Sequence, residues 1–451
     1  MSAPLRRLLI ANRGEIACRI QRAARTLGIE TVQIHSASDA GARFVTEADD
    51  ALCIGPGAPR QSYLSADRIL AAAQLTGADA IHPGYGFLSE NADFADRVEA
   101  AGLTFVGPTG DVIRRMGDKI AAKHAMEEAG VPCVPGYDGP LIDDPAALVA
   151  VAERIGFPVL IKAAAGGGGR GMRVARSAEE LPQALSTTRE EARLAFGDAT
   201  VYLEKFLGTP RHVEIQVLAD THGQAVWLGD RDCSLQRRHQ KVIEEAPAPG
   251  IDRAAIATLG EACAEACRRI GYRGAGTFEF LYQDGAFFFI EMNTRIQVEH
   301  PVTEAVTGLD LVQAQLRIAA GEPLWFDQSG VTVSGHAIEC RINAEDPDSF
   351  LPSPGRIADW QLPEHPWLRI DSHCGPGAVI PTEYDSLIGK LIVHAPDRES
   401  AVARMRRALE GTRIEGIRST LALHEWLLSD PGVQAGGIDI HHLERLLEER
   451  T

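Results

Sequence analysis

The chain has 451 residues, which is enough for two or three domains with sizeable hydrophobic cores. Its 62 acidic and 45 basic residues leave a net charge of −17, and this acidity argues against a nucleic-acid or membrane-surface partner. No apolar stretch is long enough to span a bilayer, and the polar segment Asn12–Glu15 comes too early for a signal-peptide core. The eight cysteines are scattered without a CxxC pair, as in a reduced protein, so a cytoplasmic location is expected.

The first elements of the chain form a predicted βαβ unit. Leu8–Ile10 is an expected strand, residues 14–27 an amphipathic helix, and Glu30–Ile34 a second strand. The segment Asn12–Gly14 follows the first strand at the edge where α/β sheets bind ligands, but no GxGxxG motif indicates a dinucleotide. The glycine- and aromatic-rich segment HPGYGFLSEN at residues 82–91 is either a structural loop or part of a site.

A helical pattern follows at residues 111–130 and includes Lys119, which taken alone would be a solvated lysine. After a Pro/Gly-rich linker, residues 145–206 are a predicted small α/β module. Inside it, four glycines at 166–169 follow a strand that ends at Lys162. A flexible linker is one interpretation of this run, but linkers rarely lie between two strands. Because glycine lets backbone N–H groups approach a polyphosphate closely, phosphate binding is favoured.

Four cations gather in the stretch Arg237–Lys241 of an otherwise acidic chain. The stretch comes after a predicted strand at residues 212–220 in which polar and apolar residues alternate strictly. Such a cluster suits an anionic ligand, although each residue taken singly fits a solvated turn as well. On a predicted helix further along, Cys263 and Cys267 are expected to be small buried hydrophobes, with metal ligation as the minor alternative.

A predicted β-hairpin begins at Thr277 and has a turn signal at Asp284-Gly285. A three-residue loop, residues 284–286, would place Glu279 directly opposite Glu291, with Asn293 on the same face. Two opposed carboxylates are destabilising unless a cation lies between them, and oxygen ligands suit Mg²⁺. A solvated outer face is the competing interpretation. Polar residues continue at every second position to Glu299, and if the strand persists that far, its pleat would direct Glu299 towards the site.

A third region covers residues 335–447 and starts after a Pro/Gly break at residues 321–323. Arg341 lies inside an apolar predicted strand, so its side chain is either paired in the core or directed at an anion. Further helices are expected at residues 309–320, 399–409 and 419–428.

Taken together, these motifs resemble biotin carboxylase, the ATP-grasp component of acetyl-CoA carboxylase and related enzymes. The resemblance covers almost the whole chain, and its most specific parts are EMNTRIQVEHPVTE from Glu291 and RDCSLQRRHQK from Arg231; IANRGEIA, HPGYGFLSEN, GGGGRGMR and YDSLIGKL also match. It implies an α/β (α+β) ATP-grasp fold with three domains. These are a Rossmann-like pre-ATP-grasp domain with its βαβ unit at 4–117, an ATP-grasp domain at 118–328 whose mobile lid covers about 134–207, and a C-terminal biotin carboxylase domain at 335–447.

The resemblance also implies the site residues. The phosphates of ATP would be bound by Lys119, Lys162 and His212, with Gly166, Gly167, Gly168 and Gly169 as a closing lid. The nucleotide pocket would be lined by Glu204, Lys205, the backbone of Leu207, Gln236 and His239. Two Mg²⁺ or Mn²⁺ ions would be held by Glu279, Glu291 and Asn293, and bicarbonate by Lys241, Arg295, Gln297 and the backbone of Val298. Glu299 would be the general base, and Arg341 would stabilise the biotin enolate.

The implied activity is an ADP-forming ligation that carboxylates biotin at N1′ from ATP and bicarbonate by way of carboxyphosphate. It would be the first half-reaction of an acyl-CoA carboxylase, with acetyl-CoA carboxylase of fatty acid synthesis expected. Since no Met-Lys-Met motif occurs, the biotin is expected on a separate carrier protein, with separate carboxyltransferase subunits and a homodimer. Two alternatives stay open: another ATP-grasp ligase that couples an acyl-phosphate to an amine, and a silent nucleotide-binding scaffold.

Overall fold

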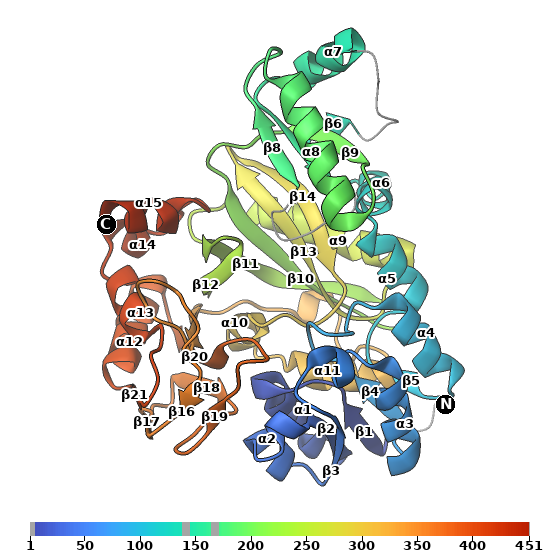
Figure 1. Ribbon diagram of the computed structural model, residues 1–451, viewed down its shortest axis with the longest axis vertical. Helices are drawn as coiled ribbons and strands as arrows, with labels where there is room; N and C mark the ends of the chain where they lie inside the picture. The colour runs from blue at the N-terminus through green and yellow to red at the C-terminus, as the bar shows by residue number, and fades with distance from the viewer. Residues whose placement is uncertain (1–4, 138–144, 164–170, 451) are drawn as a thin grey trace.

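The computed structural model describes residues 5–137, 145–163 and 171–450, and Figure 1 shows a central sheet with three other parts of the chain around it. The N-terminal part, blue in Figure 1, contains a parallel five-stranded sheet. Its strands in spatial order are β3 (Asp50–Gly55), β2 (Glu30–Ser36), β1 (Arg7–Ile10), β4 (Ala80–His82) and β5 (Thr104–Phe105). The predicted βαβ unit is confirmed, because β1 and β2 flank α1 (Gly14–Thr26) and pair in parallel.

Helices cover both faces of this sheet, and they include α2 (Arg43–Thr46), α3 (Ala66–Thr76) and α4 (Ala92–Ala100). The apolar face of α1 does not pack within its own region alone. Ile16 and Ile20 share one core with Leu311 and Leu316 of α11 (Leu311–Ala319), a helix more than 280 residues further along the chain. The first region is therefore fixed to the middle of the chain by a continuous hydrophobic core.

The single helix expected at residues 111–130 is wrong in one respect, because the chain forms two helices there. These are α5 (Gly110–Gly117) and α6 (Lys119–Glu128), and they are separated at Asp118. The Asp118 carboxylate accepts hydrogen bonds from the backbone N–H groups of Ile120 (3.0 Å) and Ala121 (2.9 Å), so it caps the second helix. The break makes Lys119 the first residue of α6 rather than a mid-helix residue.

The centre of the molecule is an eight-stranded antiparallel sheet. Its strands in spatial order are β14 (Ala286–Asn293), β13 (Gly274–Gln283), β10 (Arg211–Ala219), β11 (Ala225–Arg237), β12 (Gln240–Ala246), β15 (His336–Asn343), β20 (Leu387–Ala395) and β18 (Leu368–Ser372). The third region of the chain thus has no main sheet of its own among the described residues, because its three longest strands extend the central one. Helix α9 (Arg253–Ile270) packs on this sheet, and its Cys263 and Cys267 are fully buried among apolar residues, as expected of small hydrophobes.

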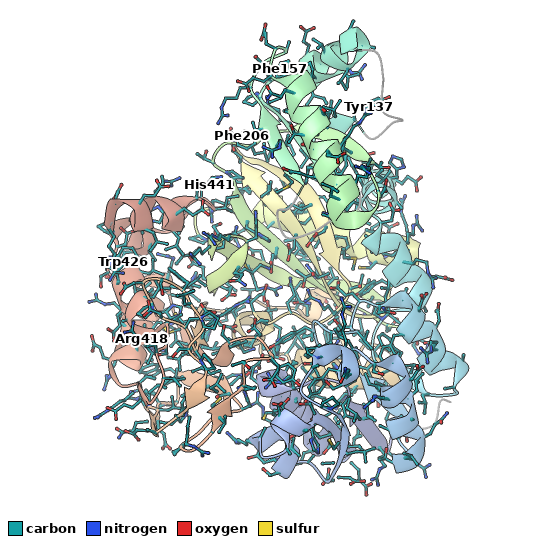
Figure 2. The ribbon with its side chains drawn as sticks, viewed as in Figure 1. Tyr137, Phe157, Phe206, Arg418, Trp426 and His441 are labelled. Carbon is teal, nitrogen blue, oxygen red and sulfur yellow. The ribbon has the colours of Figure 1, made fainter. Side chains whose placement is uncertain are left out.

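The green part at the top of Figure 1 is the small α/β module. It is a four-stranded antiparallel sheet of β6 (Gly136–Tyr137), β9 (Val201–Lys205), β7 (Val159–Ala163) and β8 (Met172–Ala175), with helices α7 (Pro145–Ile155) and α8 (Leu181–Phe196). Tyr137 and Phe157, labelled in Figure 2, pack against a core that belongs to this module alone. The predicted order of elements in this module is confirmed.

The remaining elements complete the C-terminal part, which is orange and red in Figure 1. They are β16 (Gly355–Arg356), β17 (Asp359–Gln361), β19 (Val379–Ile380), β21 (Arg413–Glu415), α12 (Arg398–Glu410), α13 (Leu421–Leu427), α14 (Pro431–Ala435) and α15 (His442–Arg450). Helix α10 (His300–Thr307) leads from the hairpin into α11. In the described residues no helix combines the length and apolar character needed to cross a membrane.

Candidate active site

One cavity of about 1060 Å³ lies where the parts of the chain meet, and every predicted site residue within the described ranges lines it. The set is Lys119, Lys162, Glu204, Lys205, Leu207, His212, Gln236, His239, Lys241, Glu279, Glu291, Asn293, Arg295, Gln297, Val298, Glu299 and Arg341. The predicted lid glycines, 166–169, lie outside the described residues. Phe206 and His441, both labelled in Figure 2, line the same cavity, although they come from the small module and from the segment just before α15.

The β13–β14 hairpin supplies the floor of this cavity. Glu279 and Glu291 are directly opposite in the register, as predicted, but the predicted three-residue loop is wrong. The turn has two residues, Asp284 (φ 53°) and Gly285 (φ 81°), both in the left-handed region that two-residue hairpins require. A bulge between the pairs Phe280–Phe289 and Glu279–Glu291 then inserts one residue, Ile290, and restores the pairing of the two carboxylates.

These two carboxylates fit a divalent cation. Burial and the neighbouring negative charge of Glu279 raise the pKa of Glu291 above its ordinary value. Asn293 is on the same face and donates from Nδ2 to Glu279 Oε1 at 2.8 Å, while its amide oxygen accepts from Arg295. Carboxylate oxygens of a buried acidic pair, of which Glu291 is the under-neutralised member, are ligands that Mg²⁺ or Mn²⁺ prefers.

Lys241 contacts three buried carboxylates beside the hairpin. Its Nζ donates to Glu279 (2.9 Å), to Glu299 (2.7 Å) and to Glu214. Burial would lower the pKa of Lys241, but the three carboxylates raise it well above the ordinary value, so the ammonium stays charged. Because this ammonium already occupies the space between Glu214, Glu279 and Glu299, it takes the place that a metal ion would have among them.

Glu299 and Arg341 approach each other from different regions of the chain. Arg341 on β15 donates to Glu299 Oε2 at 3.0 Å and to Glu244 Oε1 at 2.5 Å, so the alternative of an arginine paired in the core holds in part. Burial opposes ionisation of Glu299, but the charges of Lys241 and Arg341 lower its pKa to about 2. Glu299 is therefore an anion held between two cations.

The condition under which a strand would direct Glu299 towards the site is not met. Strand β14 ends at Asn293, and residues 297–300 form a turn in which the backbone N–H of His300 donates to the Gln297 carbonyl at 3.3 Å. Glu299 is the residue before α10, whose second residue is Pro301. Proline in the first turn favours a helix start and excludes a continued central strand, so Glu299 reaches the cavity from a helix end.

Arg295 is oriented by contacts on both sides. Its Nε donates to Glu90 Oε2 at 2.8 Å, and its Nη2 donates to Asn293 Oδ1 at 2.7 Å. Gln297 donates from Nε2 to Glu279 Oε1 at 2.8 Å. Glu90 comes from the segment HPGYGFLSEN, so this segment takes part in the site rather than serving as a plain connector.

The opposite end of the cavity carries two lysines. Lys162 Nζ donates to Glu204 Oε2 at 2.9 Å, whereas Lys119 has a lowered pKa because it is buried and faces the charge of Lys162. Two ammonium groups in one polar cavity favour an anionic ligand between them. Lys205 also lines the cavity, and its Nζ donates to the backbone carbonyls of Gly156 (2.7 Å) and Phe157 (3.1 Å).

His212 lies between two acids, with Nε2 at 3.3 Å from Glu214 and 3.2 Å from Glu279. Burial opposes its charge, but Glu279 and Glu214 raise the pKa of His212 to about 9, so it is a cation at neutral pH. Glu214 and the fully buried Arg231, which donates to it from Nε at 3.0 Å, were missed in the sequence. The strict alternation of residues 212–220 could have revealed Glu214, because it must share a face with His212.

The predicted cationic cluster at Arg237–Lys241 separates in the structure. Arg238 and His239 form the two-residue turn between β11 and β12, and both have positive φ angles. Arg237 stacks over the ring of Phe350, with its guanidinium carbon 3.8 Å from the ring centre. Only His239 and Lys241 of the four cations line the cavity, so the four cations do not form one site.

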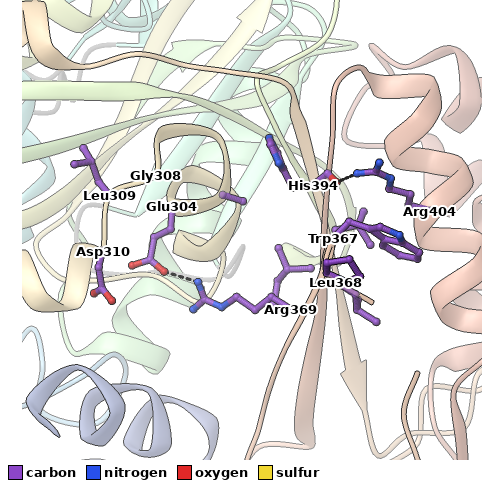
Figure 3. A pocket seen from close by; sticks show the side chains of 13 residues that line it. Glu304, Gly308, Leu309, Asp310, Trp367, Leu368, Arg369, His394 and Arg404 are labelled. Carbon is purple, nitrogen blue, oxygen red and sulfur yellow. Dashed lines mark hydrogen bonds and ion pairs between the residues drawn. The ribbon is translucent and has the colours of Figure 1, made fainter. Parts of the chain in front are cut away.

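A second cavity of about 650 Å³ lies between the C-terminal end of α10 and strands β18 and β20, and none of the predicted site residues in the described ranges lines it. In Figure 3, Arg369 extends across it to Glu304, to which it donates at 2.6 Å. Glu304 also accepts from Arg19 of α1 at 2.7 Å. These ion pairs connect the first and third regions through the helix that follows the site.

Comparison with known proteins decides among the activities that this geometry allows. Three family models match: "Biotin carboxylase, N-terminal domain" at residues 4–113, "Carbamoyl-phosphate synthase L chain, ATP binding domain" at 118–326 and "Biotin carboxylase C-terminal domain" at 339–445. Over 443 residues the chain is 59% identical to the biotin carboxylase of Haemophilus influenzae, which covers 98% of this chain and 99% of that protein. The chain belongs to the biotin carboxylase family. It is thus an ATP-grasp ligase for the ATP-dependent carboxylation of biotin.

Other biotin carboxylases and related proteins match over the same length. The biotin carboxylase of Allochromatium vinosum is 58% identical and covers 99% of this chain and 100% of that protein. One of the pyruvate carboxylase subunits of Methanothermobacter thermautotrophicus is 49% identical, with 97% of this chain and 89% of that protein covered.

Two solved biotin carboxylase structures resemble the fold closely. The Campylobacter jejuni biotin carboxylase in its β,γ-ATP complex has a TM-score of 0.93 at 45% identity, with 98% of this chain and 99% of that chain covered. The biotin carboxylase domain of Hydrogenobacter thermophilus 2-oxoglutarate carboxylase has a TM-score of 0.92 at 47% identity, with 98% of both chains covered. That structure is a dimer in complex with MgADP, ADP and bicarbonate.

Proposed function

We propose that biotin is carboxylated at N1′ in this cavity by way of carboxyphosphate, and that a separate carrier protein presents the biotin. The observation that carries the proposal is the convergence of Glu299 and Arg341, which are 3.0 Å apart although they come from different regions. One is an anion that can accept a proton, and the other is a cation that cannot titrate away. A nucleotide site alone would need neither group.

At the nucleotide end, the proposed phosphate ligands are Lys119, Lys162 and His212, with Gly166–Gly169 as part of a lid at about 134–207. Their charges support this role, because His212 is protonated at neutral pH and Lys119 faces Lys162 without an ion pair of its own within the described part of the chain. The proposed pocket for the rest of the nucleotide is lined by Glu204, Lys205, Leu207, Gln236 and His239.

The proposed metal ligands are Glu279, Glu291 and Asn293, whose fit to a divalent cation rests on their opposed register and on the raised pKa of Glu291. Bound Mg²⁺ or Mn²⁺ would neutralise charge on the phosphoryl group that is transferred. The chain's own part is to hold these oxygens on one face of the hairpin, and Lys241 and Gln297 contribute by fixing Glu279.

At the other end, the proposed bicarbonate ligands are Lys241, Arg295, Gln297 and the backbone of Val298. With a pKa of about 2, Glu299 is ionised but is a weak base. A bound anion that takes up part of the charge of Lys241 and Arg341 leaves Glu299 less compensated, and its pKa then rises towards the range in which it can accept the bicarbonate proton. The proposed role of Arg341 is to stabilise the oxyanion of the biotin enolate.

The direct test is to incubate the purified chain with ATP, Mg²⁺, labelled bicarbonate and free biotin, and to measure ADP and acid-labile carboxybiotin. We expect both products, with ADP formation stimulated by biotin. ADP formation that responds to an amine and not to biotin would support the alternative ATP-grasp ligase. Nucleotide binding without any turnover would support a silent scaffold.

We further propose that the complete enzyme is an acetyl-CoA carboxylase with separate carrier and carboxyltransferase subunits, and that this chain forms a homodimer. Support comes from the identities, which are 59% and 58% with proteins named biotin carboxylase but 49% with part of a pyruvate carboxylase. The acceptor is tested by adding the carrier and carboxyltransferase from the same cell and measuring malonyl-CoA. A pyruvate or 2-oxoglutarate carboxylase would give carboxylated pyruvate or carboxylated 2-oxoglutarate instead of malonyl-CoA. Light scattering tests the dimer.

A further inference from the structure

Three motifs of the sequence meet at the wall of the active-site cavity, where they have no role in the proposed chemistry. Glu15 comes from IANRGEIA, Tyr85 from HPGYGFLSEN and Lys390 from YDSLIGKL. Tyr85 donates from its hydroxyl to Glu15 Oε1 at 2.5 Å, and Lys390 Nζ lies 3.2 Å from the same oxygen. The three side chains thus form one chain of polar contacts that joins the first and third regions of the protein.

This chain of contacts ends on the backbone of the active site. Lys390 Nζ donates to the carbonyl oxygen of Val298 at 2.6 Å, and the lysine side chain is fully buried. A buried ammonium requires an opposite charge, and Glu15, which is 2% exposed, supplies it from the first turn of α1. Lys390 therefore links a buried anion of the first region to the peptide that joins Val298 to Glu299.

The Val298 carbonyl belongs to the turn at residues 297–300. On its other side this turn is held by the neutral ring of His300, whose Nδ1 lies 2.7 Å from the Gln297 carbonyl. A trans peptide is planar, so its N–H points away from its C=O. Fixing the Gln297 carbonyl therefore sets the direction of the Val298 N–H, and fixing the Val298 carbonyl sets the plane that leads into Glu299.

The choice of lysine at this position is informative. Lysine occurs at only six positions, although lysine and arginine together number 45. Four of the six, Lys119, Lys162, Lys205 and Lys241, line the active-site cavity, and Lys390 lies directly beneath it. A compact ammonium can reach a carboxylate and a carbonyl at one buried point, whereas the planar guanidinium needs more space and more acceptors.

We propose that Lys390, held by Glu15 and Tyr85, is a positioning residue that fixes the turn 297–300 and thereby the bicarbonate ligands Gln297 and Val298 and the base Glu299. It acts through the Val298 carbonyl and touches no substrate. The inference rests on the proposed assignment of this turn to bicarbonate, and it predicts that loss of the ammonium weakens bicarbonate use without weakening nucleotide use.

The test compares Glu15→Gln with the double variant Glu15→Gln/Lys390→Met. The double variant removes Lys390 together with its ion-pair partner Glu15, with little change in volume. Of the two other acids that face Lys390, Asp371 keeps its ion pair with Arg369, and Glu339 has a raised pKa, so it can take up a proton. The double variant nevertheless leaves the Val298 carbonyl without its donor. We expect KM for bicarbonate to rise about tenfold in the double variant, as for loss of one charge-assisted hydrogen bond, and to rise less in Glu15→Gln. KM for ATP should stay within about twofold, and Lys123→Met, a lysine outside the cavity, is the matched control.

A second measurement does not depend on the activity. Hydrogen exchange at residues 297–300 should be about tenfold faster in the double variant than in the original chain, because a constraint on the turn is gone. If the original chain turns over and the double variant keeps its bicarbonate KM, the positioning role is wrong. If the original chain shows no biotin-dependent turnover, the proposed function fails. Unchanged hydrogen exchange at residues 297–300 in the double variant would show separately that Lys390 does not fix this turn.

Discussion

At the scale of single residues, the site is a set of buried carboxylates whose charges are compensated to different degrees. Lys241 and Arg341 lower the pKa of Glu299 to about 2 against the effect of burial, whereas burial and the charge of Glu279 raise that of Glu291. The two acids are therefore prepared for different partners. Glu299 is compensated by cations of the chain itself, whereas Glu291 is left less compensated, as the proposed metal site requires.

Replacing Glu291 with Gln tests this difference. The amide keeps the shape of the side chain but removes half of the opposed acidic pair, so ATP turnover should fall about a hundredfold, as for other electrostatic groups that stabilise a transferring phosphoryl group. The Mg²⁺ concentration needed for half-maximal turnover should rise, with only partial rescue at high Mg²⁺. Turnover and Mg²⁺ dependence equal to those of the original chain would rule out Glu291 as a metal ligand.

A buried histidine behind the site makes stability depend on pH. His424 lies 2.6 Å through Nε2 from the backbone carbonyl of Arg341, and burial lowers its pKa to about 4. The unfolded chain, with a histidine pKa of about 6.5, binds more protons below that pH than the folded chain does. The stabilisation is therefore complete above about pH 6.5 and is lost as the pH falls towards 4.

Urea unfolding at pH 5 and pH 6 measures this contribution. His424 alone should lower the free energy of unfolding by about 1 kcal/mol between pH 6 and pH 5. His424→Gln keeps a donor for the carbonyl but cannot titrate, so its free energy of unfolding should fall less over this interval, by about that amount. An identical pH dependence for the variant and the original chain would show that His424 is already charged in the folded protein.

At the scale of elements, small interruptions place the functional side chains. The bulge at Ile290 brings Glu279 opposite Glu291, and the break at Asp118 puts Lys119 at the start of a helix. Each interruption loses regular backbone hydrogen bonds but sets the position of one functional side chain. The helix break is offset by the Asp118 cap, whose two backbone hydrogen bonds satisfy N–H groups that would otherwise lack partners within the helix.

Asp118→Ala removes this cap. The free energy of unfolding should fall by about 1 kcal/mol, and nucleotide affinity should fall as well, because the first turn of α6 carries Lys119. Asp118→Asn retains a capping oxygen and serves as the control, with both quantities close to those of the original chain. A normal nucleotide affinity in a destabilised Asp118→Ala protein would show that the cap does not determine the position of Lys119.

The hairpin and the site show how far sequence reasoning reaches. Opposed residues of a hairpin have a constant sum of residue numbers, and this sum allows Glu279 to face Glu291. It cannot distinguish a three-residue loop from a two-residue turn with a bulge, because both shift the register by one. Glu299 does line the cavity, although the alternation of polar residues does not continue as a strand up to it. Glu244, the partner of Arg341, was not predicted, because its position depends on the pairing of β12 with β15, which are about 90 residues apart in sequence.

At the scale of the whole molecule, the continuous central sheet brings the chemistry together. Strands β13 and β14 carry the carboxylates, β12 carries Lys241, and β15 from the third region carries Arg341. The first region closes the site through Glu90 and Glu15. The lysines proposed for phosphate and the arginine proposed for biotin come from different regions, and the fold brings them to one cavity.

The most direct test of this account is ADP release with and without biotin for Arg341→Gln and Glu299→Gln. Arg341→Gln should keep nucleotide affinity near normal and lose about a hundredfold in biotin-dependent turnover, because it removes one oxyanion donor. Glu244, whose pKa burial already raises to about 7, can take up a proton when its partner is removed, which limits the damage to the fold. Glu299→Gln should lose ADP release both with and without biotin, because the base acts before biotin reacts. Equal loss of nucleotide affinity in both variants would contradict the assigned division of roles.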